Sequence, residues 1–183
     1  MLPVESLRGQ LLVAGPSLLD PNFHRTVVLV AEHNEEGAMG VVLNRESELE
    51  VEEAAPALTD LVPPGALVHA GGPVQPTAVM IVAEFEDTAH AATIVVDGVG
   101  FVAADADFDT LGDEVIRVRV FAGLAGWGPG QLETELERDD WIVEPATAND
   151  IFAPPDALWS SVLERKGGQY ALVARMPDDP SLN

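Results

Sequence analysis

The sequence has 183 residues, of which 47% are apolar and 22% are charged, and this composition is typical of one globular domain with a substantial core. Its 31 acidic residues outnumber the 9 basic ones, and the formal charge of −22 argues against direct binding to nucleic acid or to an anionic membrane. The sequence contains no cysteine, which excludes disulfides, thiolate metal ligands and cysteine nucleophiles.

The cellular location is predicted from what the sequence lacks. No apolar run reaches the ~18 residues expected of a membrane-spanning helix, and residues 1–10 lack the basic start and apolar centre of a signal peptide. We therefore expect a cytoplasmic protein. Its acidity favours a solvated surface that keeps the chain soluble, and the alternative is an acidic face that docks a basic partner.

The first half of the chain predicts short strands joined by turns. Runs of apolar and β-branched residues predict strands at 10–14, 25–33 and 38–43, and the second run is too continuously apolar to have a solvated face. Asn34 to Gly37 reads as a hairpin turn with its glycine in the left-handed conformation. Further along, the pattern predicts a short or kinked helix over 52–61 with Pro56 inside it, a strand at 67–70 and a glycine turn at 71–74.

The second half adds further strands and the clearest helix. Apolar runs predict strands at 78–85 and 92–96, an extended piece at 101–102 and a brief edge strand at 141–143. Helical signals predict a capped short helix over 105–111, one turn over 149–152 and a helix over 154–166 whose apolar face is Leu158, Trp159, Val162 and Leu163. Residues 170–176 are expected to pack as a last short helix or strand, and 177–183 as a frayed tail.

Residues 118–137 form the stretch around which the rest is expected to be organised. Val118, Val120 and Ala122 alternate with Arg119, Phe121 and Gly123, as in a buried strand. A turn rich in glycine follows at 126–130, and a helix is predicted with Pro129 in its first position and with Leu132 and Leu136 on one face. A strand, a tight turn and a helix start in sequence can direct backbone N–H groups at a ligand.

Strands outnumber helices, and neighbouring strands follow one another as hairpins do. This pattern predicts an α+β fold: a single domain over residues 1–183, with a strongly curved, barrel-like sheet that is mixed or mostly antiparallel and is flanked by three to five helices.

Three stretches together resemble a known family. They are residues 16–45 (PSLLDPNFHRTVVLVAEHNEEGAMGVVLNR), residues 69–74 (HAGGPV) and residues 125–141 (AGWGPGQLETELERDDW), and in this order they resemble the YqgE/AlgH family of uncharacterised bacterial proteins. The resemblance implies a soluble single domain with a curved, barrel-like sheet, and it implies no catalytic residues. Some members carry a regulator label connected with alginate production, which names no chemistry. The single lysine, Lys166, and the strong acidity depart from the family pattern.

Two histidines stand at the ends of predicted strands. If the two strands were neighbours, Glu32, His33 and His69 could form a cluster that holds Zn²⁺ or transfers a proton. Their spacing gives no support to a metal site, and such a histidine more often caps a turn by hydrogen bonding to the backbone. We therefore predict neither a metal nor a cofactor.

A hypothetical ligand-binding cleft is expected where the segments 33–44, 71–74 and 126–133 converge. Trp127 is flanked by glycines and is expected to be accessible for stacking, whereas Trp141 and Trp159 are expected in the core. The asparagines and glycines are equally natural turn residues. The turn at 126–130 lacks the Lys-Ser/Thr of a phosphate loop and the spacing of a dinucleotide motif. The candidate residues are His33, Asn34, Asn44, Gly71, Gly72, Trp127, Gln131 and Glu133.

These observations favour a non-catalytic binding or regulatory protein that acts through protein or small-ligand contacts, with its partner unidentified and its oligomeric state open. One alternative is a hydrolase-type enzyme that uses the same cleft, although the sequence contains no GxSxG motif. Another is a transcription-associated regulator that acts through a partner protein, because the acidity disfavours direct contact with DNA.

Overall fold

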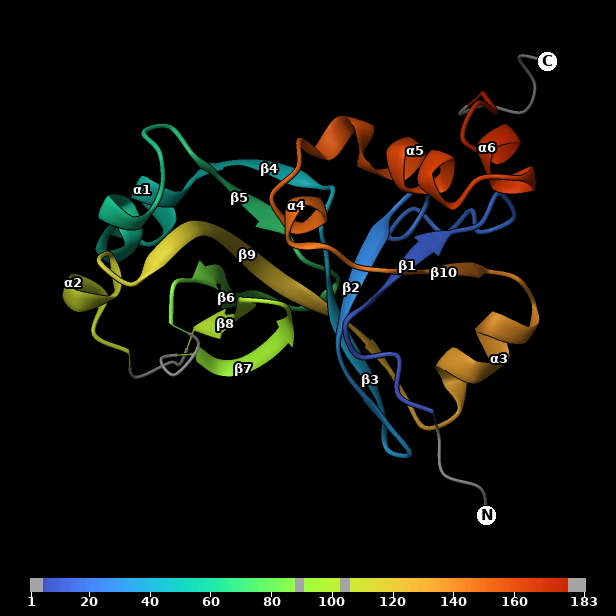
Figure 1. Ribbon diagram of the computed structural model, residues 1–183, viewed down its shortest axis with the longest axis horizontal. Helices are drawn as coiled ribbons and strands as arrows, with labels where there is room; N and C mark the ends of the chain where they lie inside the picture. The colour runs from blue at the N-terminus through green and yellow to red at the C-terminus, as the bar shows by residue number, and fades with distance from the viewer. Residues whose placement is uncertain (1–4, 88–90, 103–105, 178–183) are drawn as a thin grey trace.

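The computed structural model describes residues 5–87, 91–102 and 106–177, and in these residues ten strands form one curved sheet that is flanked by helices (Figure 1). The strands are β1 (Gln10–Ala14), β2 (Val27–Asn34), β3 (Gly37–Val42), β4 (Glu46–Glu50), β5 (Leu67–Ala70), β6 (Val74–Phe85), β7 (Ala91–Val96), β8 (Val99–Val102), β9 (Val115–Trp127) and β10 (Trp141–Pro145). The helices are α1 (Val51–Ala54), the 3-10 helix η1 (Pro56–Leu61), α2 (Phe108–Leu111), α3 (Gln131–Glu137), α4 (Ala148–Ile151), α5 (Pro155–Lys166) and α6 (Gln169–Val173). The predicted α+β class and curved sheet are confirmed, whereas the six α-helices and one 3-10 helix of the described residues exceed the three to five helices that were predicted.

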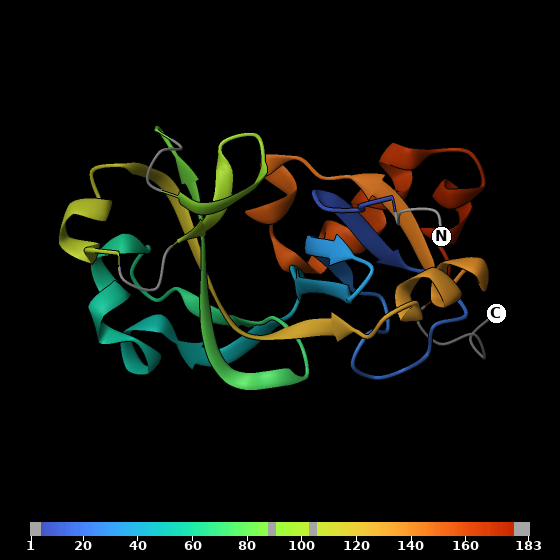
Figure 2. The same ribbon diagram turned by 90° about the horizontal axis from the view of Figure 1, so that it is seen from below.

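Strand β9 joins the two halves of the molecule. The strand order is β10-β1-β2-β3-β9-β6-β8-β7, and β5 pairs with both β9 and β4. Figures 1 and 2 show β9 running from the half that contains α1, α2 and β4 to β8 into the half that contains β1 to β3 and α3. The pairing of β5 with β9 is parallel, and the other pairings of the described strands are antiparallel. The stretch that was predicted to organise the chain therefore lies at its centre.

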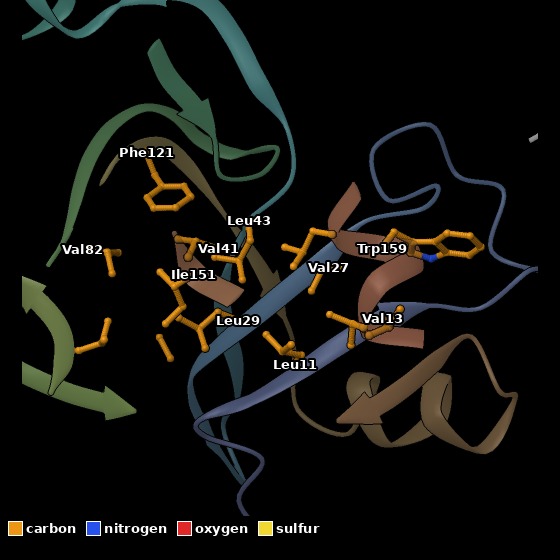
Figure 3. Packing of buried hydrophobic residues seen from close by; sticks show 14 of the residues in the cluster. Leu11, Val13, Val27, Leu29, Val41, Leu43, Val82, Phe121, Ile151 and Trp159 are labelled. Atoms are coloured by element: carbon orange, nitrogen blue, oxygen red, sulfur yellow. The ribbon is translucent and has the colours of Figure 1, made fainter. Parts of the chain in front are cut away.

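Both faces of β1 and β2 are buried, which explains their continuous apolar runs. Leu11 and Leu29 face the cluster that includes α5, whereas Leu12 and Val28 face the cluster that includes Leu132 of α3. Figure 3 shows the first cluster, in which residues of β1, β2 and β3 pack with Phe121 and Ile151. The indole of Trp159 in α5 donates a 2.9 Å hydrogen bond to the carbonyl of Ala14. The predicted core positions of Trp141 and Trp159 are confirmed.

Several predicted elements differ at their ends. The helix α3 begins at Gln131, because Gly130 precedes it in the left-handed conformation and leaves Pro129 in the turn. The strand β6 begins at Val74, within the predicted glycine turn, and β2 begins at Val27 because Arg25 has a φ of 55°. The split into α1 and η1 before Pro56 confirms the predicted kink.

One strand was missed and two predictions lie partly outside the described residues. The polar strand β4 was not predicted, since four of its five residues are Glu or Ser. The start of the helix predicted over 105–111 and the predicted tail after 177 fall outside the described residues. Among the helices that are described, none is long and apolar enough to cross a membrane.

Candidate functional site

The three segments of the predicted cleft, 33–44, 71–74 and 126–133, lie side by side, and their contacts are between backbone atoms. Gly40 pairs with Ala125, and the carbonyl of Gly71 accepts a 2.8 Å hydrogen bond from the N–H of Val42. A Cβ on Gly72 would lie 2.2 Å from the carbonyl of Leu124, so only glycine allows this approach. The convergence of these segments thus builds the junction between β3, β5 and β9.

The polar side chains of this junction bond within the protein. Asn44 accepts a 2.8 Å hydrogen bond from the N–H of Val27 and donates a 2.9 Å bond to the carbonyl of Arg25. Asn34 accepts from the N–H of Glu36 at 2.8 Å, which closes the hairpin turn. Gln131 accepts from the N–H of Gly128 at 3.0 Å. These three side chains act on neighbouring backbone, as turn and capping residues do.

The expected accessibility of Trp127 is wrong. Its indole is 6% exposed and packs against Phe23 and Trp141, at centroid distances of 6.4 and 6.0 Å. Its N–H donates to the carboxylate of Glu135 at 3.1 Å. Trp127 is the last residue of β9 and pairs with Ala38 of β3, and its ring belongs to the cluster that includes Leu132 of α3.

His33 and Glu133 form a pair between β2 and α3. The Nε2 atom of His33 lies 2.6 Å from Oε1 of Glu133, and its Nδ1 accepts a 3.1 Å hydrogen bond from the N–H of Leu7. Because Nδ1 accepts a hydrogen, the proton of the neutral ring resides on Nε2 and is donated to the carboxylate. Partial burial would raise the pKa of Glu133. The hydrogen bond from His33 and a second one from the backbone N–H of Glu133 outweigh burial, so the pKa of Glu133 is lowered.

The hypothetical cluster of Glu32, His33 and His69 does not form. His33 pairs with Ala38 of β3, which in turn pairs with Trp127 at the end of β9. His69 instead pairs with Phe121, nearer the middle of β9. These two positions on β9 are roughly 20 Å apart at about 3.3 Å per residue. Within the described residues, no group of three His, Asp or Glu side chains is placed to hold a metal ion.

A groove between β5 and β9 holds His69 instead. It has a volume of about 590 Å³, within the usual range of small-ligand sites. One wall is the segment 60–67 and the other is residues 116–120 of β9; Glu46, Val51, His69 and Phe152 complete the lining. Successive side chains of β9 point to opposite faces of the sheet. Val118 and Val120 pack with the core around Val51, while Arg119 lies on the opposite face, the same face as Phe121.

The ring of His69 is 3% exposed, and neither of its nitrogens has a hydrogen-bond partner among the described residues. It packs on Phe121, with 5.5 Å between the ring centroids, and its Nε2 lies 4.0 Å from a carboxylate oxygen of Glu46. Burial foremost, and then the positive charge of Arg119, lower the pKa of His69 to about 4. The backbone of Leu67 lies close enough to the ring to raise this pKa slightly, but the contact does not meet the geometry of a hydrogen bond. The ring is therefore neutral at pH 7, with one N–H donor and one acceptor.

Arg119 is held beside His69 by the end of α4. Its Nη1 donates to the carbonyls of Ile151 and Ala153 at 3.0 and 2.9 Å, and its Nη2 donates to the carbonyl of Phe152 at 3.2 Å. These carbonyls follow the C-terminus of α4, where a cation is favourable. Burial lowers the pKa of Arg119, yet a guanidinium stays protonated at neutral pH.

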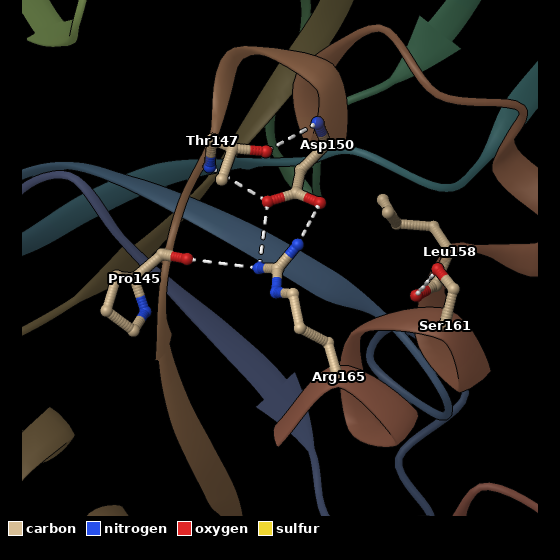
Figure 4. Close-up of polar contacts among 6 residues, drawn as sticks. All are labelled: Pro145, Thr147, Asp150, Leu158, Ser161 and Arg165. Carbon is tan, nitrogen blue, oxygen red and sulfur yellow. Dashed lines mark hydrogen bonds and ion pairs between the residues drawn. The ribbon is translucent and has the colours of Figure 1, made fainter. Parts of the chain in front are cut away.

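An ion pair fixes α4 itself. Asp150 is 6% exposed, and its carboxylate accepts hydrogen bonds from Nη1 and Nη2 of Arg165, at 2.7 and 3.0 Å. It also completes a capping box with Thr147 at the start of α4 (Figure 4). Arg165 in α5 thus positions the helix whose last carbonyls hold Arg119.

Besides Arg119, the groove has one arginine in an ion pair and two carboxylates. Arg117 is paired with Glu84 and lies over the ring of Phe152 at 4.6 Å. Glu46 and Asp60 contribute carboxylates to the lining. Arg119 is thus a groove cation whose hydrogen-bond partners in the described residues are carbonyls rather than carboxylates.

The sequence pointed to His69 as part of a possible cluster for Zn²⁺ or proton transfer, or as a turn cap, and it gave no role to Arg117 or Arg119. A signal was present: two arginines alternate with valine in a strand that is otherwise apolar, in a chain with 9 basic residues. Charged residues on the inner face of a strand need partners, and this placement marks a polar site.

Comparison with known proteins places the whole chain among related bacterial proteins. Residues 11–171 match the model of a family described as AlgH-like. A UPF0301 protein of Streptomyces coelicolor is 43% identical over 190 residues, covering 100% of this chain and 98% of its own length. A crystal structure of a Corynebacterium diphtheriae protein has a TM-score of 0.87 at 32% identity, covering 96% of this chain and 95% of that chain. The solution structure of AlgH from Pseudomonas aeruginosa has a TM-score of 0.71 at 29% identity, covering 97% and 98%.

Proposed function

The chain belongs to the AlgH-like family, and from its groove we propose that it is a non-catalytic binding protein of the cytoplasm whose ligand lies between β5 and β9. In this proposal the ligand is bound by hydrogen bonds to His69 and by the charge of Arg119. The protein then acts through the molecule that it binds, without changing it.

The observation that carries the proposal is the pair of unused nitrogens on His69. A buried polar group without a partner costs roughly 1–3 kcal/mol, so a fold keeps one where something else supplies the partner. The ring borders a groove wide enough to admit such a partner. The walls also supply apolar contacts, because Val118 and Val120 lie on the same groove.

Binding has more support than hydrolysis. The lining of the groove contains no serine, threonine or second histidine among the described residues, so a neutral His69 has no side-chain hydroxyl to activate. With its pKa lowered to about 4, the ring is also a weak base toward water. In the segments predicted for a hydrolase cleft, the side chains of Asn44, Gln131 and His33 are engaged in bonds within the protein.

The test is nuclear magnetic resonance of the protein with ¹⁵N-labelled histidine, titrated with a library of small metabolites and short peptides. We expect at least one compound to shift the ring nitrogens of His69 while those of His33 stay in place. His33 serves as an internal control because its nitrogens are already bonded to Leu7 and Glu133. Shifts that spread equally over both rings, or no shift at His69 with any compound, would overturn the proposal.

A further inference from the structure

We propose that the occupant of this groove is the free C-terminal end of a polypeptide, which adds as a short strand to the open edge of β9. This inference rests on the proposed function and names its ligand class. Three features of the groove support it: an unpaired strand edge, a closed end, and a cation at that closed end with unused donors.

Among the described strands, none pairs with the edge of β9 that faces the groove over Val115 to Val120. On this side β9 pairs with β5 only at Phe121 and Ala122, and with β3 at residues 125–127. The carbonyl of Ala122 accepts from the N–H of Gly71 on the β5 side. Backbone groups alternate between the two edges of a strand, so those of Val120 and Val118 also face this side. An extended peptide can use such groups as a strand of the sheet does.

The groove closes where β5 joins β9. The first paired residue of β5 is His69, opposite Phe121, and the chain before it diverges to form the other wall. A strand that follows β9 toward this point cannot continue past His69, because β5 already occupies the edge. The chain of the ligand must therefore end or turn sharply beside His69 and Arg119, and the length of open edge, six residues, is about 20 Å.

The charge at the closed end selects a carboxylate. A guanidinium has five N–H donors, and Arg119 uses three of them on the carbonyls of residues 151–153. The two others have no partner among the described residues and suit a carboxylate, whereas an N-terminal ammonium offers them no acceptor. The N–H of His69 adds a further donor. Glu46, whose side chain is 44% exposed, lies close enough to compete with an incoming carboxylate and is free to turn toward solvent.

The first experiment compares two displayed libraries of random heptapeptides, one ending in a free C-terminus and one with its C-terminus fused to a carrier. We expect enrichment from the free library alone. An enriched peptide, synthesised as the acid and as the C-terminal amide, should bind at least tenfold more weakly as the amide, because a charge-assisted hydrogen bond is lost. Methylation of successive backbone nitrogens should weaken binding at every second position, as expected of a strand.

Variants of the protein test whether the residues at the closed end of the groove bind the peptide carboxylate. Glu46→Gln should tighten binding of the acid severalfold and leave the amide unchanged, whereas Glu48→Gln, also on β4 but outside the groove lining, should change neither. His69→Gln should weaken binding of the acid. Because Glu46 is partly exposed, its variant is expected to fold even if His69→Gln does not.

The outcomes distinguish this inference from the proposed function. Equal binding of acid and amide, or loss on methylation at every position without alternation, would overturn the C-terminal strand. If a small molecule shifts the ring of His69 while neither peptide library yields a binder, the inference fails and the proposed function stands. If neither peptide nor small molecule affects His69, both fail.

Discussion

The imidazole of His69 lies where a charged ring is unfavourable. It is buried against Phe121, close to the positive charge of Arg119, and its pKa falls to about 4. The same burial leaves its two nitrogens without hydrogen-bond partners among the described residues. His69 therefore lowers the stability of the ligand-free protein, and the same two nitrogens can form hydrogen bonds with a ligand.

This environment predicts a pH dependence of stability. In the unfolded chain His69 binds a proton near pH 6.5 and in the native state near pH 4, so the unfolded state binds more protons between these values. Stability should therefore fall as the pH falls through this window, by roughly 3 kcal/mol from this group. Urea unfolding of the wild type and of His69→Gln at several pH values tests this, and two parallel pH profiles would contradict it.

Single residues show where prediction from sequence reached its limit. The core positions of Trp141 and Trp159 followed from apolar patterning, whereas the exposure predicted for Trp127 failed. The fate of Trp127 depends on Phe23, more than a hundred residues earlier in the chain, and local pattern contains no information on that contact. For the same reason the sequence named His69 but could not place Arg119 beside it.

At the scale of elements, the short helix α4 depends on one ion pair for its position. The buried carboxylate of Asp150 accepts hydrogen bonds from Arg165 and from the N–H of Thr147, so Asp150→Ala would remove half of the capping box and leave Arg165 without its carboxylate partner. We expect a loss of roughly 2–4 kcal/mol in the free energy of unfolding. Arg138→Ala, which breaks the exposed pair with Asp140, should cost less than about 1 kcal/mol. Chemical denaturation of both variants measures the difference, and equal losses would show that Asp150 has no special role.

The junction of β5 and β9 makes a second prediction at this scale. Gly72 and Gly130 both have positive φ, 149° and 75°, but a Cβ on Gly72 would meet the backbone of Leu124 whereas a Cβ on Gly130 would meet nothing within 4 Å. Gly130→Ala should cost about 1–2 kcal/mol from conformation alone. Gly72→Ala should cost considerably more, beyond about 4 kcal/mol. Similar unfolding midpoints for the two variants would mean that the backbones are not packed as described.

Most elements were predictable because their signals are local. The helix α5 has its apolar face in the sequence, and the split before Pro56 follows from the missing N–H of proline. The strand β4 has the sequence ESELE and is polar; it forms because β5 offers it a partner. The sequence does not reveal which distant segments pair, and the groove is lined by segments that are far apart in the chain.

The whole molecule carries a formal charge of −22, which must repel itself in the compact state. Salt screens this repulsion over a Debye length of ~10 Å at 0.1 M. We therefore expect the midpoint of thermal unfolding to rise by several degrees between about 10 mM and 500 mM NaCl. Scanning calorimetry across this range tests the expectation, and a midpoint that falls with salt would indicate that attractive ion pairs dominate.

The central claim is that a ligand site at His69 lies in the groove between β5 and β9. The most direct measurement is a crystal structure of the protein with the tightest-binding compound from the histidine titration. The account predicts that this compound lies between β5 and residues 116–120, with one polar atom within hydrogen-bonding distance of His69 and another near Arg119. A compound bound elsewhere, with His69 hydrogen-bonded only to ordered water, would contradict it.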